Sequence, residues 1–417
     1  MTPFTSPIIP GLLPFMQRIK AWLQELPSLT PARARAYFVI WMGLQLMFAA
    51  LMANRFMQES VTKGGGKPVG QDLTAFWAAA HMAILGHPGL AYNDGAIAAF
   101  EHANVWVGSA ASSRFPFLYP PVYLLLILPL GLVGYLPAMV GFLASGYALL
   151  AACVRKLALP KAGWLALVFS PAMLVNVLIG QNGAYTASCF AGAMLFLDRS
   201  PALGGACLGF LVCKPHLAIA VPLALMAARR WRALFACGGT ALGLCLMSLL
   251  VFGADSWVQF FHHARQTAAV LQDYSVEWPK MQGFFGAVHV LHGSNALAFV
   301  VYGVLALASA AVVVRVAMGR PGAGPEMATL AVASLLCTPY MFDYDLTCLL
   351  APMGFIGTDA LRRGWLSWEK LALLGLYALP LVARLMTMQA GIPLVPPALV
   401  CALALCARRA LAPPKAA

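Results

Sequence analysis

The chain has 417 residues, of which 61% are hydrophobic and only 10% are charged, and its mean hydropathy is +0.79. Soluble domains carry about 25% charged residues, so this composition excludes a soluble globular protein and indicates an integral membrane protein. The apolar runs are continuous instead of alternating, which predicts membrane-spanning helices. The net charge of +13 does not indicate a nucleic-acid partner, because the cations gather at the ends of apolar runs.

Residues 1–36 are proline-rich and basic, contain no recognisable cleavable signal peptide, and are predicted to be cytoplasmic. A single transmembrane domain is predicted for residues 37–410, with a cytoplasmic tail at 411–417. Several apolar runs are shorter than the ~20 residues of a full crossing, so we expect an all-α polytopic bundle of about 11–13 transmembrane helices. The candidate spans are Tyr37–Phe56, Tyr119–Leu136, Pro137–Val154, Trp164–Ile179, Tyr185–Leu197, Ala202–Cys213, Leu217–Ala228, Ala233–Phe252, Ala296–Ala317, Met327–Tyr340, Leu346–Ile356, Leu371–Leu385 and Ile392–Cys406.

The basic clusters predict the orientation of these spans, since cytoplasmic loops carry an excess of lysine and arginine. Outer loops are then expected at 57–118 and 253–295. The basic group from Arg155 to Lys161 fits only if the chain crosses an odd number of times after Leu118, where two candidate spans lie. Either one of these spans is re-entrant, or this group breaks the rule. The remaining clusters are Arg18, Lys20, Arg33 and Arg35; Arg229, Arg230 and Arg232; Arg315 and Arg320; Arg362, Arg363 and Lys370; and Arg408, Arg409 and Lys415.

The first outer loop contains the stretch Gly70 to Tyr92, which predicts an amphipathic helix stopped by Gly86 and Pro88. Asp72 stands at the start of this helix. Its carboxylate either caps the helix by accepting the first N–H groups or serves as a catalytic carboxylate at the membrane surface.

Two short motifs follow in the chain. Tyr119-Pro-Pro reads as the start of a helix, because proline lacks a donor that would be unpaired there. Gln181 and Asn182 are flanked by glycines between two apolar runs, which indicates either a tight turn or amide ligands for sugar hydroxyls.

Lys214-Pro-His216 lies between two apolar runs. A lysine in such a position is costly in lipid and usually functional, and Pro215 predicts a broken helix that lines a cavity. Lys214 is expected either to hold a lipid phosphate or to snorkel to the membrane interface.

An outer turn is predicted at Thr338 to Asp345, where Tyr340, Asp343 and Asp345 combine aromatic rings with carboxylates. This combination suits a carbohydrate site and equally an interfacial aromatic belt. The two aspartates lie two residues apart, which is only a weak signal for a metal site. We therefore expect no metal or other cofactor, with a divalent ion as the open alternative. No Walker, Rossmann, HExxH or CxxC motif is present.

Together these motifs resemble glycosyltransferase family 87 over about residues 37–360. The resemblance rests on Asp72-Leu-Thr-Ala-Phe-Trp, Leu85-Gly-His-Pro with Tyr92, Tyr119-Pro-Pro, Gly180-Gln-Asn, Lys214-Pro-His, Arg230-Trp-Arg and Thr338-Pro-Tyr with Asp343-Tyr-Asp. It implies a C-type glycosyltransferase (GT-C) fold in a bacterial-type inner membrane, with the active site on the periplasmic side.

The resemblance further implies a polyprenyl-phosphate sugar donor, usually of mannose and sometimes of arabinofuranose, and a lipid or glycan acceptor. It assigns the general base to Asp72. His216 stands where many members have glutamine. We expect Lys214, assisted by Arg114, to neutralise the leaving phosphate, and Gln181, Asn182, Tyr119, Tyr340, Asp343 and Asp345 to contact substrate. The alternative is a transporter or lipid flippase without glycosyl transfer.

Overall fold

The computed structural model describes residues 12–27, 29–62, 70–105, 115–272 and 278–412. Within these ranges all regular secondary structure is helical, apart from one isolated antiparallel bridge between Met281 and Phe342. The predicted all-α polytopic class is therefore confirmed. The α-helices are α1 (Leu12–Glu25), α2 (Pro31–Thr62), α3 (Gln71–Ile84), α4 (Asp94–Asn104), α5 (Pro121–Ile127), α6 (Tyr135–Val154), α7 (Lys161–Val168), α8 (Pro171–Ile179), α9 (Gly183–Phe196), α10 (Pro201–Gly209), α11 (Pro215–Ala218), α12 (Val221–Ala227), α13 (Trp231–Gln272), α14 (Phe284–Val290), α15 (Asn295–Gly319), α16 (Ala323–Leu336), α17 (Leu350–Arg363), α18 (Glu369–Ala390) and α19 (Val395–Leu411). The 3-10 helices are η1 (Pro88–Tyr92), η2 (Leu128–Leu132), η3 (Phe210–Cys213), η4 (Trp278–Lys280) and η5 (Asp343–Leu349).

Length and hydropathy mark some of these helices as membrane spans. Among the described residues, five are long and apolar enough to cross a bilayer, namely Tyr135–Val154, Lys161–Ile179, Trp231–Thr267, Asn295–Gly319 and Glu369–Ala390. Shorter apolar helices fill the spaces between them at Pro121–Leu132, Gly183–Phe196, Pro201–Cys213, Pro215–Ala227 and Ala323–Leu336. Many of the short runs in the sequence are thus short helices packed inside a bundle.

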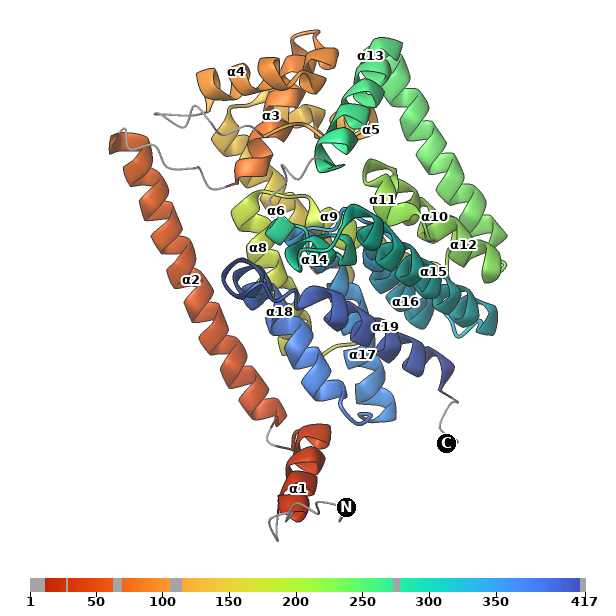
Figure 1. The fold of residues 1–417 in the computed structure, drawn as a ribbon. Helices are drawn as coiled ribbons and strands as arrows, with labels where there is room; N and C mark the ends of the chain where they lie inside the picture. Colours follow the sequence, from red (N-terminus) through yellow and green to blue (C-terminus); the bar gives the residue numbers. More distant parts are fainter. Residues whose placement is uncertain (1–11, 28, 63–69, 106–114, 273–277, 413–417) are drawn as a thin grey trace, which may run out of the picture.

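The helices arrange around two large buried apolar clusters, and a small third cluster contains Met281, Phe285 and Ala298. One cluster surrounds α9 and α16 and includes Phe190 and Leu330. The other surrounds α3 and includes Phe76, Phe117 and Phe252. Figure 1 shows α3, α4 and the bend of α13 at one end of the molecule, and the far ends of α17 and α19 at the other. The candidate site lies where the two clusters meet.

The long helix α2 stands along one side of the bundle (Figure 1) and is fastened to a break in another span. At that break, between α7 and α8, the carbonyl of Phe169 accepts hydrogen bonds from Trp41 Nε1 at 2.8 Å and Gln45 Nε2 at 2.6 Å. A carbonyl freed by a helix break must find a donor in a membrane, and these side chains supply it.

The segment from Pro121 to Leu132 bears on how many times the chain crosses the membrane between Leu118 and Arg155. Its twelve residues would extend about 18 Å as a helix, which is too short for a crossing. It returns to α3 instead, where Val133 O accepts from Trp77 Nε1 at 2.8 Å and Gly131 O lies 2.9 Å from His81 Nδ1. The candidate span Tyr119–Leu136 is therefore not one continuous helix, which favours the re-entrant alternative for this segment.

Lys156 lies near one of the other basic clusters, that of Arg229, Arg230 and Arg232. It lines a cleft with Asp198 and Arg199, and Asp198 accepts a 2.7 Å bond from Arg230. Arg230 also pairs with Glu326 at 2.6 Å. These contacts tie the end of α9 to the starts of α13 and α16.

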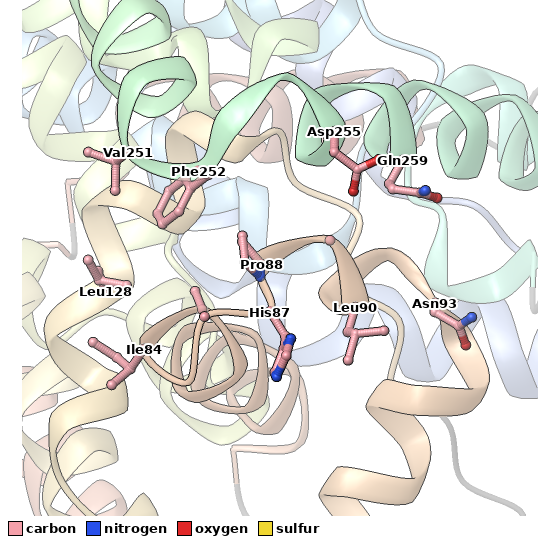
Figure 2. A pocket seen from close by; sticks show the side chains of 13 residues that line it. Ile84, His87, Pro88, Leu90, Asn93, Leu128, Val251, Phe252, Asp255 and Gln259 are labelled. Carbon is pink, nitrogen blue, oxygen red and sulfur yellow. The ribbon is translucent and has the colours of Figure 1, made fainter.

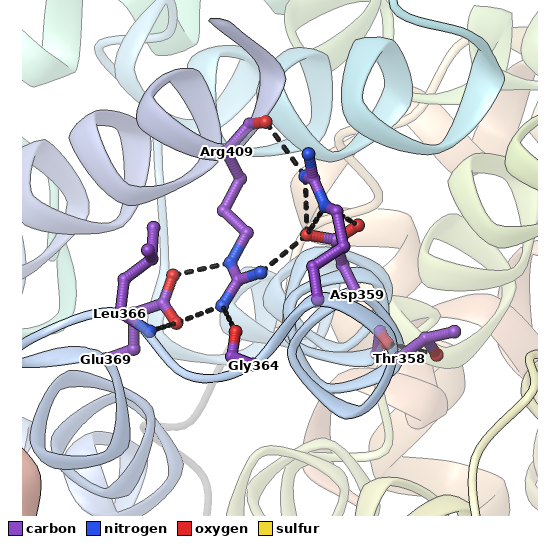
Figure 3. Close-up of polar contacts among 8 residues, drawn as sticks. Thr358, Asp359, Gly364, Leu366, Glu369 and Arg409 are labelled. Carbon is purple, nitrogen blue, oxygen red and sulfur yellow. Dashed lines mark hydrogen bonds and ion pairs between the residues drawn. The ribbon is translucent and has the colours of Figure 1, made fainter. Parts of the chain in front are cut away.

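The ends of α17, α18 and α19 carry a second ionic network, drawn in Figure 3. Arg409 is only 2% exposed and pairs with both Asp359, at 2.6 Å, and the fully buried Glu369. Arg363 pairs with the same Asp359 at 2.6 Å. These arginines therefore hold helix ends together instead of standing in free loops.

Candidate active site

The site begins where two glycines from distant parts of the chain touch. Gly70 precedes α3 with φ +76°, and Gly180 follows α8 with φ +78°. The Gly70 N–H donates to Leu178 O at 3.0 Å, and a Cβ on Gly180 would lie 2.7 Å from Gly70 Cα. Neither the left-handed backbone nor the spacing leaves room for a side chain. This contact fixes the start of α3 against the end of α8.

Asp72 follows two residues after Gly70 and is held by side chains. Its Oδ2 accepts a 2.6 Å hydrogen bond from Gln181 Nε2, and Gln181 Oε1 accepts one from the Tyr119 hydroxyl at 3.0 Å. Gly70 is the N-cap of α3, which has no side-chain cap. The capping interpretation of Asp72 is therefore wrong, and three of the predicted site residues form one hydrogen-bonded chain.

Burial raises the pKa of Asp72 to about 6. The Gln181 hydrogen bond opposes this shift, the charge of Asp343 adds to it, and the charges of Lys280 and Lys214 oppose it. A carboxylate with this pKa is ionised at neutral pH and still basic enough to accept a proton from an alcohol in a transition state.

The Gly180–Gly183 stretch is the tight turn that the glycines indicate. Asn176 Oδ1 accepts the Gly183 N–H at 2.7 Å and closes the turn. Asn182 is 3% exposed and lies beside Tyr119 and Tyr123. Both amides of the motif are thus buried at the site, and their contact with a sugar stays a prediction.

Lys214 occupies the predicted helix break. Its backbone is non-helical, with φ −127° and ψ 71°, between η3 and α11. Its Nζ lies 2.7 Å from Asp345 Oδ1 and 4.8 Å from the centroid of the Tyr344 ring. The Lys214 side chain is 3% exposed, so the snorkelling interpretation is wrong. Half-buried His216 lies in the first turn of α11.

The Thr338–Asp345 turn presents its carboxylates inward. The second oxygen of Asp345 accepts the Phe342 N–H at 3.1 Å, and the Thr338 hydroxyl accepts the Tyr340 N–H at 3.2 Å. Asp343 pairs with Arg384 of α18 at 3.3 Å. Burial raises the pKa of Asp343, and the Arg384 charge opposes that shift.

The Thr338–Asp345 turn also carries the weak metal signal of the sequence. Both of its carboxylates already have cationic partners. Over the described ranges, no group of three or more histidine, cysteine, aspartate or glutamate side chains is arranged to hold a metal ion. Arg114, the remaining predicted site residue, lies outside the described residues.

Sequence reasoning missed three charged residues here. Arg384 interrupts the apolar run Leu371–Leu385, and a charge inside a span is a signal for function. Lys280 carried no local signal, and its charge acts on Asp72. Glu101 is fully buried, and its Oε1 lies 3.2 Å from the Thr74 hydroxyl.

Glu101 is electrically linked to the site. Burial raises its pKa to about 7, the Thr74 hydrogen bond opposes this, and the charge of Asp72 adds to it. The hydroxyl of Thr74 also donates to Gln71 O at 2.6 Å, so it anchors the turn that carries Asp72.

A cleft of about 710 Å³, shown in Figure 2, lies at the other end of α3. Ile84, Leu128 and Phe252 line one part of it, and Asp255 and Gln259 line another. The twelve residues from Asp72 to Ile84 place it about 18 Å along the helix from the carboxylate. This cleft is therefore separate from the Asp72 site.

Residues 117–339, more than half of the chain, match the sequence model of glycosyltransferase family 87. The matched residues include Tyr119, Gln181 and Lys214, whereas Asp72 and Asp343 lie outside them. No curated protein and no solved structure matches the chain. The helical membrane architecture and the matched sequence agree with the resemblance, and the chain belongs to glycosyltransferase family 87, as a membrane glycosyltransferase.

Proposed function

We propose that the protein transfers a sugar from a polyprenyl-phosphate donor to a hydroxyl group of a lipid or glycan acceptor, with Asp72 as general base. Mannose is the first sugar to test, because the resemblance points to it. The observation that carries the proposal is the Tyr119–Gln181–Asp72 hydrogen-bonded chain, which holds a carboxylate with a pKa of about 6 near the charges of Lys280 and Lys214.

The reaction needs one proton acceptor and one stabilised leaving group. Asp72 takes the proton of the acceptor hydroxyl while that oxygen attacks the anomeric carbon. The bond from this carbon to the phosphate oxygen breaks, and the electron pair leaves with the lipid phosphate. Attack opposite the phosphate inverts the anomeric centre, so a β-linked donor gives an α-linked product.

The other site residues serve binding and orientation. Gln181, held by Tyr119, fixes the direction of the Asp72 carboxylate. Lys214 supplies positive potential beneath the leaving phosphate. Asn182, Tyr340, Asp343, Asp345, His216 and Arg114 are proposed as further substrate contacts.

We further propose that the site faces the periplasmic side of the inner membrane. The Asp72 end of the bundle is opposite the ends that carry the arginine clusters (Figure 1), and such clusters favour the cytoplasm. Single cysteines at His87 and Arg320, in a background without native cysteines, test this. His87→Cys is expected to react with a membrane-impermeant reagent from outside, and Arg320→Cys only after lysis; the reverse result contradicts the orientation.

Purified protein in nanodiscs is tested with radiolabelled polyprenyl-phosphate mannose, other polyprenyl-phosphate sugars and a membrane lipid extract as acceptor. A glycosyltransferase forms a labelled product that resists mild acid, whereas a transporter or flippase only redistributes the donor. Absence of product with every donor, together with donor movement across the bilayer, would support the alternative function.

A further inference from the structure

Two cationic side chains, Lys280 and Arg384, lie near the consecutive residues Phe342 and Asp343 (the Phe342–Asp343 step) and come from different elements. The isolated bridge between Met281 and Phe342, with Gln282 N donating to Met341 O at 2.8 Å, fastens the η4 segment to this step. Lys280 directly precedes Met281, so it is held beside the step. Arg384 reaches Asp343 from α18. The two cations therefore flank one short piece of backbone next to the Asp72 site.

Arg384 differs from Lys214 in how far its charge is neutralised. Lys214 and Asp345 form a closed pair, 3% and 1% exposed, at 2.7 Å. Arg384 is 35% exposed, and its contact with Asp343 is longer, at 3.3 Å through a single nitrogen. Guanidinium carries five N–H donors in a planar fork suited to phosphate. Arg384 thus presents donor capacity beyond its pair with Asp343.

The surface around Arg384 is apolar. Leu381, Leu385 and Met388 of α18 are 43%, 58% and 54% exposed. Leu381 and Met388 lie three residues before and four after Arg384, so they share its helix face. A cation in an exposed apolar stripe fits an anion that carries a hydrocarbon chain better than it fits a free anion.

We propose that Arg384 and Lys280 form the binding site for the phosphate group of a prenyl phosphate, whose chain lies along Leu381, Leu385 and Met388. This assignment rests on the proposed function, because the phosphate is that of the donor before transfer and of the released lipid afterwards. Lys280 is placed to act on the same phosphate while its charge also acts on Asp72. Lys214 is enclosed in its pair with Asp345 and is not part of this site.

Binding of farnesyl phosphate, farnesol and inorganic phosphate to the full chain in detergent tests the proposal, with tryptophan fluorescence as the readout. Wild type is expected to bind farnesyl phosphate tightly, farnesol at least about tenfold more weakly, and inorganic phosphate more weakly still. Arg384→Gln and Lys280→Gln are each expected to weaken farnesyl phosphate about tenfold or more and leave farnesol unchanged. Arg265→Gln, an exposed cation on α13, is the matched control and is expected to bind like wild type.

Asp343→Asn separates direct contact from a structural role of Arg384. If Arg384 binds phosphate, releasing it from Asp343 keeps or tightens farnesyl phosphate binding. A loss equal to that of Arg384→Gln would show that the ion pair is what matters and would overturn the proposal. So would unchanged binding in both glutamine variants, equal loss of farnesol binding, or equal affinity of wild type for inorganic phosphate.

The two proposals fail in different ways. If purified enzyme transfers sugar but the glutamine variants bind farnesyl phosphate normally, the phosphate site is wrong and the proposed function stands. If no donor supports transfer but farnesyl phosphate binding depends on both cations, the phosphate site stands and the proposed reaction is wrong.

Discussion

The Arg409 network and the Asp72 site both bury carboxylates, but they treat them differently. At the ends of α17, α18 and α19, Glu369 and Asp359 each face an arginine, and every charge is matched. At the candidate active site, Asp72 accepts a hydrogen bond from the neutral amide of Gln181. A carboxylate matched by a close cation is a poor proton acceptor, whereas one held by an amide keeps its basicity.

The comparison teaches that burial alone does not identify a catalytic carboxylate in this chain. Glu369 is more completely buried than Asp72, yet its surroundings make it structural. The group that contacts the carboxylate determines whether it can accept a proton. Substitutions at Asp72 should therefore lower activity more than stability, and substitutions at Glu369 should lower stability more than activity.

The largest effect on turnover is expected from Asp72→Asn. Loss of general-base assistance should lower kcat by about 10²–10⁴-fold. Asparagine is nearly isosteric and the Asp72 side chain does not cap α3, so the melting temperature should stay close to wild type. Turnover is measured with the radiolabelled donor, and stability by thermal unfolding in detergent. Near-normal kcat would remove Asp72 from the mechanism and make Glu101 and Asp343 the next candidates.

Glu369→Gln should show the opposite profile. It leaves the buried Arg409 with only Asp359 as its carboxylate partner, and removing one member of a buried pair costs about 3–5 kcal/mol. Unfolding temperature should fall clearly, while kcat of the protein that remains folded at low temperature stays near wild type. Arg265→Gln serves as the surface control. A strong loss of kcat in folded Glu369→Gln would break the contrast between the two regions.

Lys214 combines a buried ion pair, as in the Arg409 network, with a place in the candidate active site. Its substitution therefore tests stability and activity together. Lys214→Met should raise the KM for donor about tenfold or more, and it also leaves buried Asp345 without its cation. In Lys214→Met with Asp345→Asn the uncompensated charge is gone, so stability should recover while donor use stays weak. Recovery of both would assign Lys214 a structural role only.

The smallest predicted effect is a shift in pH dependence. Asp72 must be ionised to accept a proton, so kcat/KM should rise as pH increases through about 6. The Gln181 hydrogen bond lowers this pKa, and Gln181→Leu should therefore move the acidic limb to higher pH. The pH profiles of both proteins give the test, with Asn182→Leu for comparison. A limb that moved to lower pH would contradict the assigned role of Gln181.

Much of the architecture was predictable because it depends on local sequence patterns. Continuous apolar runs predicted the helical class, Pro215 predicted the break at Lys214, and Gly86 predicted the end of α3 near Ile84. The Gly180 turn follows from the freedom of glycine to adopt positive φ. Each of these features depends on a few neighbouring residues.

Features that depend on distant residues were not predictable in the same way. The pair of Lys214 with Asp345 joins residues 131 positions apart, and the bond of Gln181 to Asp72 joins residues 109 apart. The return of η2 to α3 depends on contacts such as Trp77 with Val133, not on hydropathy. A single sequence shows that Arg384 is costly in a span but does not show that Asp343 is its partner.

The contact between Gly70 and Gly180 has a consequence for exchanging parts between enzymes. The base and the amide that holds it each lie within two residues of this crossing, so their spacing is set by two backbones in direct contact. A segment that contains α3, grafted from a relative, would keep that spacing only if glycine stood at both positions. Replacing the segment that follows α3 would leave the Gly70–Gly180 contact, and with it the spacing of Asp72 and Gln181, unchanged.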